Sequence, residues 1–99
     1  MASASKVAYS VVISDDAQEF IFNLDEKSRR ICTSNLQKLN QPYPGRGVGD
    51  KERLVIEGEE MYRLHIGRSY TAFYLIIEEA KLVRVLEVMS IETAHKRYG

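Results

Sequence analysis

The chain has 99 residues, with 14 basic and 14 acidic side chains and a formal net charge of zero. Its hydrophobic fraction of 44% suits a globular protein, and its length suits one domain. We therefore expect a single domain over residues 1–99, with residues 1–6 as a disordered tail. A protein that binds nucleic acid over its whole surface is usually basic, so any RNA contact of this neutral chain has to be local.

Several classes of protein are disfavoured by the same sequence. No apolar run approaches the roughly 20 residues of a membrane helix, and the first residues lack the apolar core of a signal peptide. A single cysteine excludes an internal disulfide and a cysteine-rich zinc site. We therefore expect a cytoplasmic protein that has no membrane partner.

The N-terminal part of the chain predicts one strand and two helices. Tyr9, Val11 and Ile13 alternate with Ala8, Ser10 and Val12, as in a strand. Asp16 stands three residues before Glu19, which is the spacing of a capping box that opens a helix. A second helix is predicted from residue 25. Their predicted buried positions are Ala17, Phe20, Ile21 and Leu24, and then Ile31, Cys32, Leu36 and Leu39. The short joint between them predicts an antiparallel hairpin.

The second half of the chain predicts a sheet. Residues 40–50 contain two prolines and three glycines and are expected to form a loop, followed by a brief strand candidate at 53–56. Three longer runs follow at 61–66, 70–77 and 82–89, joined by turns short enough for an antiparallel meander. The run 70–77 is apolar on both faces, which places it centrally. The predicted fold is α+β, in the order β-α-α-β-β-β, with the helical hairpin packed on a twisted, mainly antiparallel sheet.

The strand at 61–66 carries the candidate catalytic groups. Successive side chains alternate across a strand, so Arg63 and His65 share the face opposite Tyr62 and Leu64. Arg68 follows in the turn, and a histidine and several cations lie at the C-terminal end. A base, an acid and cationic stabilisers are what cleavage of an RNA phosphodiester through its 2′-hydroxyl requires, and no metal is needed. In the alternative interpretation, His65 is merely solvated, and the arginines pair with Glu59, Glu60 or Glu78.

Three features together resemble the RelE/ParE superfamily of toxins from bacterial and archaeal toxin-antitoxin pairs. They are the order of elements, the entry Leu24–Ile31 into the second helix, and the run Met61–Gly67 followed by tyrosines at 70 and 74. The resemblance covers roughly residues 8 to 98. It implies a ribosome-dependent mRNA endonuclease (mRNA interferase), or in the ParE branch a gyrase inhibitor. Either would be neutralised by a RelB-like antitoxin, and neither needs a small-molecule cofactor.

The resemblance assigns roles to individual residues. It implies that Arg63 stabilises the phosphate and that His65 is the general base. Two cations of the family are missing, because Thr71 stands where an arginine is expected and residues 90–93 contain no basic residue. A rebuilt site would use His95 as the acid and Arg68 as a further stabiliser. The RNA-contacting residues would then be Lys96, Arg97 and Tyr98.

The missing cations leave three interpretations open. Removing one preorganised charge stabiliser typically lowers a rate by about 100-fold to 1,000-fold, so an endonuclease with this sequence is expected to be weak. A ParE-like gyrase inhibitor would need no catalytic cations. An inactive RelE homologue retained for antitoxin binding would not need them either.

Overall fold

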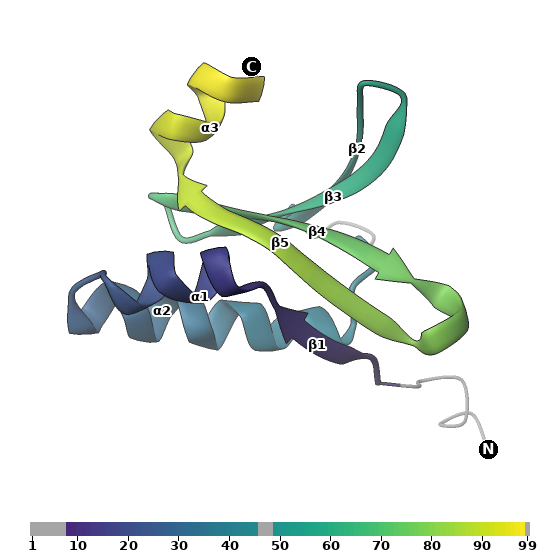
Figure 1. The fold of residues 1–99 in the computed structure, drawn as a ribbon, viewed down its shortest axis with the longest axis horizontal. Coiled ribbons are helices and arrows are strands. Elements are labelled where there is room, and N and C mark those ends of the chain that lie inside the picture. The colour runs from purple at the N-terminus through teal and green to yellow at the C-terminus, as the bar shows by residue number, and fades with distance from the viewer. Residues whose placement is uncertain (1–7, 46–48, 99) are drawn as a thin grey trace.

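The computed structural model describes residues 8–45 and 49–98, so the predicted tail at 1–6 and part of the glycine-rich loop lie outside the described residues. Figure 1 shows the arrangement of the elements. In chain order they are β1 (Ser10–Ile13), α1 (Asp15–Phe22), α2 (Glu26–Leu36), η2 (Gln37–Asn40), β2 (Lys51–Ile56), β3 (Glu59–Ile66), β4 (Tyr70–Ile77), η3 (Glu78–Ala80), β5 (Leu82–Ser90) and α3 (Ile91–Tyr98). Of the helices in this described part, none combines the length and apolar character needed to cross a bilayer.

The five strands form one sheet in the order β1-β5-β4-β3-β2. Strand β1 pairs with β5 in parallel, and all other pairs are antiparallel. Helices α1 and α2 lie along one side of the sheet, and α3 stands on the other (Figure 1). The predicted α+β class and the central position of residues 70–77 are confirmed. The candidate at 53–56 is part of a full edge strand, and α3 was not predicted, because its residues were interpreted as a tail.

Helices α1 and α2 begin at side-chain caps. The Ser14 hydroxyl accepts a hydrogen bond from the N–H of Ala17 (3.1 Å), so α1 starts at Asp15. The capping box predicted at Asp16 is therefore wrong, because Ser14 already has the extended backbone and the side-chain oxygen that a cap requires. Asp25 caps α2 by accepting from the N–H of Ser28 (3.2 Å), which confirms the predicted start.

The main core lies between the helical hairpin and the sheet. Its buried members are Ala17, Ile21, Cys32, Leu36, Leu39, Tyr62, Leu64, Ile66, Ala72, Tyr74, Val83, Val85 and Val88. The prediction that Ile31 is buried was wrong, since 38% of it is exposed. Cys32, Leu36 and Leu39 follow helical spacing toward the sheet, which leaves Ile31 at the margin of this stripe, beside the β3–β4 turn.

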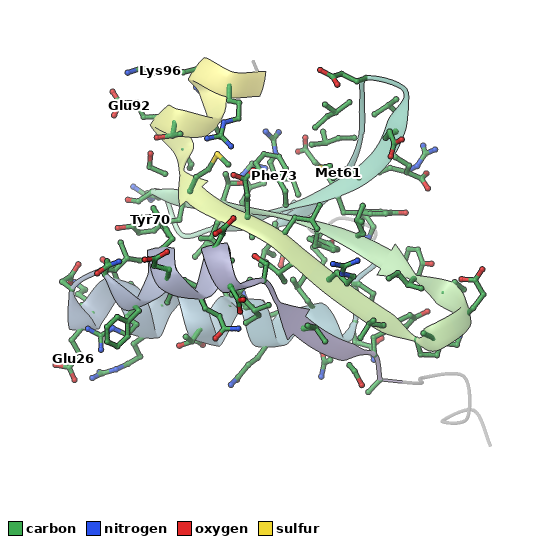
Figure 2. The ribbon with its side chains drawn as sticks, viewed as in Figure 1. Glu26, Met61, Tyr70, Phe73, Glu92 and Lys96 are labelled. Atoms are coloured by element: carbon green, nitrogen blue, oxygen red, sulfur yellow. The ribbon has the colours of Figure 1, made fainter. Side chains whose placement is uncertain are left out.

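A second, smaller core lies on the other face of the sheet. Phe73 and Met89 are buried there against Ala94 of α3, with Leu54 and Met61 packed beside them. Figure 2 shows Phe73 and Met61 on the same side of the sheet as α3. Phe73 points away from the main core because its neighbours Ala72 and Tyr74 point into it. This small cluster seats α3 on the sheet.

Candidate functional site

The turn between β2 and β3 sets the register of the candidate site. Glu57 and Gly58 both have positive φ, 52° and 81°, as in the two-residue turns that join hairpin strands. Counting outward from this turn, Glu52 pairs with Arg63. Both side chains therefore lie on the face opposite the helical hairpin.

Glu52 links the two predicted catalytic residues of β3. Arg63 donates a hydrogen bond from Nη2 to Oε2 of Glu52 (2.6 Å), and Nε2 of His65 lies 3.3 Å from Oε1 of the same carboxylate. Burial raises the pKa of Glu52, but the hydrogen bonds from His65 and Arg63 outweigh this effect, so its pKa lies below the usual value. The ionised carboxylate thus holds an imidazole and a guanidinium side by side, and we call Glu52, Arg63 and His65 the catalytic cluster.

The alternative ion pairs expected from the sequence do not form at Arg63. Glu60 pairs with Arg53 across the β2–β3 hairpin, and Glu78 pairs with Lys81. Glu59 lies beside the hairpin turn, opposite Ile56, several pairs away along the strand. The pairing prediction was wrong because the register of β2 and β3 places Glu52 opposite Arg63.

A second ion pair extends the same face toward α3. Cross-strand pairing places Arg63 beside Phe73, and Phe73 beside Glu87. Arg97 of α3 donates from Nη1 to Oε2 of Glu87 (2.7 Å). The site face thus carries a row that runs from Glu52 on β2 through β3, β4 and β5 to a cation on α3. Each acid in this row holds a cation of this chain.

The other predicted residues lie outside the catalytic cluster. Arg68 lies in the β3–β4 turn and lines a pocket with α2. His95 is exposed on α3, about 100° around the helix from the buried Ala94. No hydrogen bond or ion pair in the described part of the chain joins either residue to His65, so the proposed histidine pair stays a prediction.

The C-terminal cations differ in direction. Lys96 points away from the sheet in Figure 2, whereas Arg97 reaches back to Glu87. Tyr98 ends α3, and its side chain lies outside the described set. Thr71, where the resemblance leads one to expect an arginine, is buried and donates its hydroxyl hydrogen to the carbonyl oxygen of Leu64 (3.2 Å). Position 71 therefore serves the structure of the strand pair.

The sequence interpretation missed two acids of this face, Glu52 and Glu87. A signal for Glu52 was present, because Gly58 after Glu57 suits a two-residue turn and that turn fixes the pairing with Arg63. The predicted strands at 53–56 and 61–66 leave residues 57–60 unpaired, which hides this register. Glu87 had no such signal, because its contact with α3 depends on a helix that was not expected.

The geometry supports acid–base chemistry on an anionic substrate. The imidazole of His65 can accept or donate a proton, a carboxylate orients its ring, and a neighbouring guanidinium can oppose negative charge. Within residues 8–45 and 49–98, no group of three histidine, cysteine, aspartate or glutamate side chains could hold a metal ion.

No protein-family model matches the sequence, and no curated protein does. Several solved structures are similar to this chain. A chain of the archaeal RelE–RelB complex from Pyrococcus horikoshii matches with a TM-score of 0.67 and 20% identity, over 84% of this chain and 94% of that one. A chain of the RelBE2 toxin-antitoxin complex from Mycobacterium tuberculosis matches with a TM-score of 0.69 and 19% identity, over 85% of this chain and 99% of that one. The isolated RelE toxin from E. coli matches with a TM-score of 0.56 and 20% identity, over 91% of this chain and 98% of that one. The fold of this chain, as the resemblance implied, is the fold of the RelE toxins.

Proposed function

We propose that this chain is the toxin of a toxin-antitoxin pair and that it cleaves mRNA on the ribosome in the cytoplasm. The observation that supports this function best is the catalytic cluster, in which Glu52 holds Arg63 and His65 together on the open face of a RelE fold. A base and a cation at one place are the groups that 2′-hydroxyl attack on a phosphodiester needs.

His65 acts as the general base in this mechanism. Its Nε2–H donates to Glu52, which fixes the ring and leaves the lone pair of Nδ1 to accept the 2′-hydroxyl proton. The 2′-oxygen then bonds to phosphorus while the bond from phosphorus to the 5′-oxygen breaks, and Arg63 opposes the charge on the phosphoryl oxygens. An acid on α3, proposed as His95, protonates the leaving oxygen. The products are a 2′,3′-cyclic phosphate and a 5′-hydroxyl.

Substrate positioning has to come largely from the ribosome. The chain is neutral, and the cations of the site face are already held by Glu52 and Glu87. Free RNA is therefore expected to bind weakly, with further contacts from Lys96, Arg97 and Tyr98 on α3. Holding the reacting groups in place can supply much of the rate enhancement, so a ribosome that presents the mRNA makes a weak site useful.

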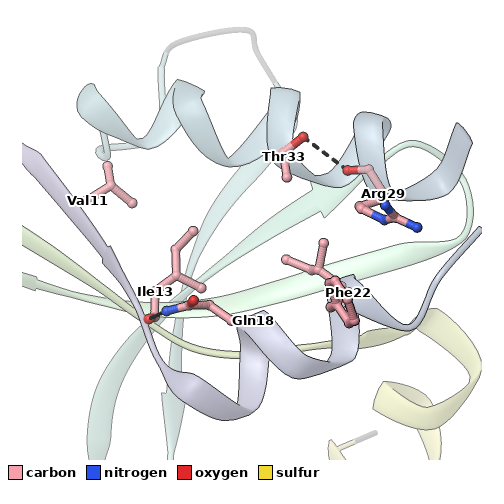
Figure 3. A pocket seen from close by; sticks show the side chains of 7 residues that line it. Val11, Ile13, Gln18, Phe22, Arg29 and Thr33 are labelled. Carbon is pink, nitrogen blue, oxygen red and sulfur yellow. Dashed lines mark hydrogen bonds between the residues drawn. The ribbon is translucent and has the colours of Figure 1, made fainter. Parts of the chain in front are cut away.

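The antitoxin partner is assigned to an apolar groove beside β1. A groove of about 470 Å³ lies between β1, α1 and α2, and Figure 3 shows Val11, Ile13 and Phe22 along it, with Arg29 at the α2 side. Phe22 is 73% exposed. We assign this groove to an apolar segment of a RelB-like antitoxin, which folds as it binds. Co-expression with the adjacent reading frame should give a stable complex that Phe22→Glu weakens.

An inactive relative kept for antitoxin binding is the second candidate. The observation that favours it is the pairing of the site-face cations with acids of this chain. Glu52 pairs with Arg63 and Glu87 pairs with Arg97, although a bound phosphate would need these cations. The buried Thr71 in place of the expected arginine points in the same direction. A ParE-like gyrase inhibitor is equally compatible with a neutral face.

A ribosome cleavage assay separates these functions. Wild-type protein should cleave ribosome-bound mRNA without added metal, and His65→Ala should lower the rate by about 100-fold, as expected for loss of a general base. Arg84→Ala, which removes an exposed cation outside the cluster, is the matched control and should retain activity. Absence of cleavage by the wild type would reject the nuclease, and inhibition of gyrase supercoiling would then identify the ParE-like function.

A further inference from the structure

A pocket of about 300 Å³ lies between α2 and the β3–β4 turn, apart from the groove assigned to the antitoxin. Lys27 lines it from the helix, and Arg68 and Ser69 line it from the turn. We propose that this pocket binds a backbone phosphate of the RNA strand, next to the phosphate that the catalytic cluster attacks. This inference rests on the proposed function and assigns to Arg68 a positioning role in place of the predicted catalytic one.

The charges around the pocket favour an anion. Its walls bring together two cations and two serines, and no carboxylate is among the described residues that line it. The nearby acids of α2 are engaged elsewhere, because Asp25 caps the helix and Glu26 pairs with Arg30. Among the described residues, Lys27 and Arg68 form no ion pair. They differ in this from Arg63 and Arg97, which are held by acids of this chain.

The turn that carries Arg68 is held in place. Gly67 adopts a positive φ of 59°, and the pair Ile66–Tyr70 closes the hairpin. On the other side, the N–H of Ile91 donates to the carbonyl oxygen of Ser69 (2.8 Å), which ties the turn to the start of α3. A cation on a braced turn loses less conformational freedom on binding than one on a loose loop.

The position of the pocket suits a flanking phosphate. Arg68 lies in the turn that directly follows β3, three residues after His65. Tyr70 and Ile31 form an apolar wall of the pocket, and the Tyr70 ring is held edge-on against Phe20 with centroids 6.0 Å apart. A phosphate can therefore contact the two cations while its ribose lies against this wall. Ile66 lines the pocket from the helix-covered face and His65 lies on the other face, so an RNA strand that occupies both sites passes around the β3–β4 turn.

Titration with an uncleavable RNA tests this assignment. The probe is a five-nucleotide RNA with 2′-O-methyl groups, because it cannot react through a 2′-hydroxyl. We expect the amide resonances of Lys27, Gly67 and Ser69 to shift on titration. Arg68→Gln and Lys27→Gln should each weaken RNA binding by about 3- to 10-fold. Each should also reduce the slope of log binding constant against log salt concentration, in magnitude, by roughly 0.7, the value for one phosphate contact on a single strand. Lys38→Gln, an exposed lysine outside the pocket, should change neither.

The outcomes separate this inference from the proposed function. The pocket assignment is overturned if Arg68→Gln and Lys38→Gln change RNA binding equally. It is also overturned if the amide shifts are confined to residues 52, 63 and 65. Neither result would contradict the proposed nuclease function. Inorganic phosphate that shifts the same amides with an affinity equal to that of the RNA would overturn the RNA assignment in favour of a general anion site. If RNA shifts the amide resonances of the pocket but the protein does not cleave mRNA on the ribosome, the RNA-binding pocket is supported and the nuclease function is rejected.

Discussion

The two faces of the sheet are built from the same strands and differ in almost every physical property. On the helix-covered face, Tyr62, Leu64 and Tyr74 are buried against α1 and α2, and polar groups there are few. On the site face, Arg63 and His65 are only partly buried and share one carboxylate. The hydrophobic effect therefore stabilises the fold mainly from one side, and the other side carries the charge.

This difference shows how a chain of 99 residues combines a stable fold with an open polar surface. Alternation along β3 assigns every second residue to stability and the rest to the site. The separation is incomplete, because Phe73, Met89 and Ala94 form a small core within the site face. That core holds α3, so packing on the site face should affect function as well as stability.

The largest expected effect comes from the two cores. Leu64→Ala and Phe73→Ala each remove a fully buried side chain, one from each face, and should each cost about 3 to 5 kcal/mol of unfolding free energy. Because Phe73 also seats α3, Phe73→Ala should speed proteolysis within residues 91–98 before global unfolding, and Leu64→Ala should not. Urea unfolding combined with limited proteolysis measures both. Identical proteolysis patterns would show that the small core has no separate role.

A buried hydroxyl on the helix-covered face gives the next effect. Tyr74 donates its hydroxyl hydrogen to the carbonyl oxygen of Pro42 (2.6 Å), which ties the loop before β2 to the central strand. Tyr74→Phe leaves that buried carbonyl without its partner and should cost about 1 to 3 kcal/mol. Tyr70→Phe is the control, since no hydrogen bond of its hydroxyl is found among the described residues. A Tyr74→Phe variant as stable as the wild type would contradict this role of the loop contact.

Removal of the shared carboxylate tests the site face. Glu52→Gln should slow cleavage by about 10-fold at neutral pH, because the amide orients His65 less firmly, while the fold is retained. The pKa of Glu52 lies below its usual value, so its carboxylate stays charged well into the acidic range. The rate difference should therefore be present at neutral pH and disappear as pH falls through that pKa. A pH-independent difference would indicate that Glu52 has a purely structural role.

The smallest effect is expected at a surface cluster far from the site face. Glu78 accepts hydrogen bonds from Lys81, Tyr43 and Tyr9, which lower its pKa to about 2 from 4.5. A group with a lowered pKa stabilises the fold above its unfolded pKa and loses that contribution as pH falls toward the folded value. Thermal unfolding of Glu78→Gln should thus differ from wild type above about pH 4.5 and converge with it near pH 2. A constant difference over this range would refute the linkage.

The sequence by itself determined the local features of this protein. Strand periodicity placed Arg63 and His65 on one face, because side chains alternate whatever the partner strand is. The apolar character of both faces identified residues 70–77 as the central strand. Asp25 marked the start of α2, because a cap depends on residues within one turn. These features rest on contacts close in the sequence.

Only the tertiary structure decided the partners of these residues. Glu52 reaches Arg63 through the register of β2 and β3, and Arg97 reaches Glu87 through α3. Helix α3 was missed, although the Ser90 hydroxyl accepts a hydrogen bond from the N–H of Thr93 as a cap would. Among the side chains of α3 that the structure describes, Ala94 alone is buried, so the apolar signal of this helix is short. The exposure of Ile31 was equally hidden, because it depends on which side of α2 meets the sheet. Alternation and capping are short-range, whereas pairing across the sheet brings together residues far apart in the chain, and these contacts formed the site.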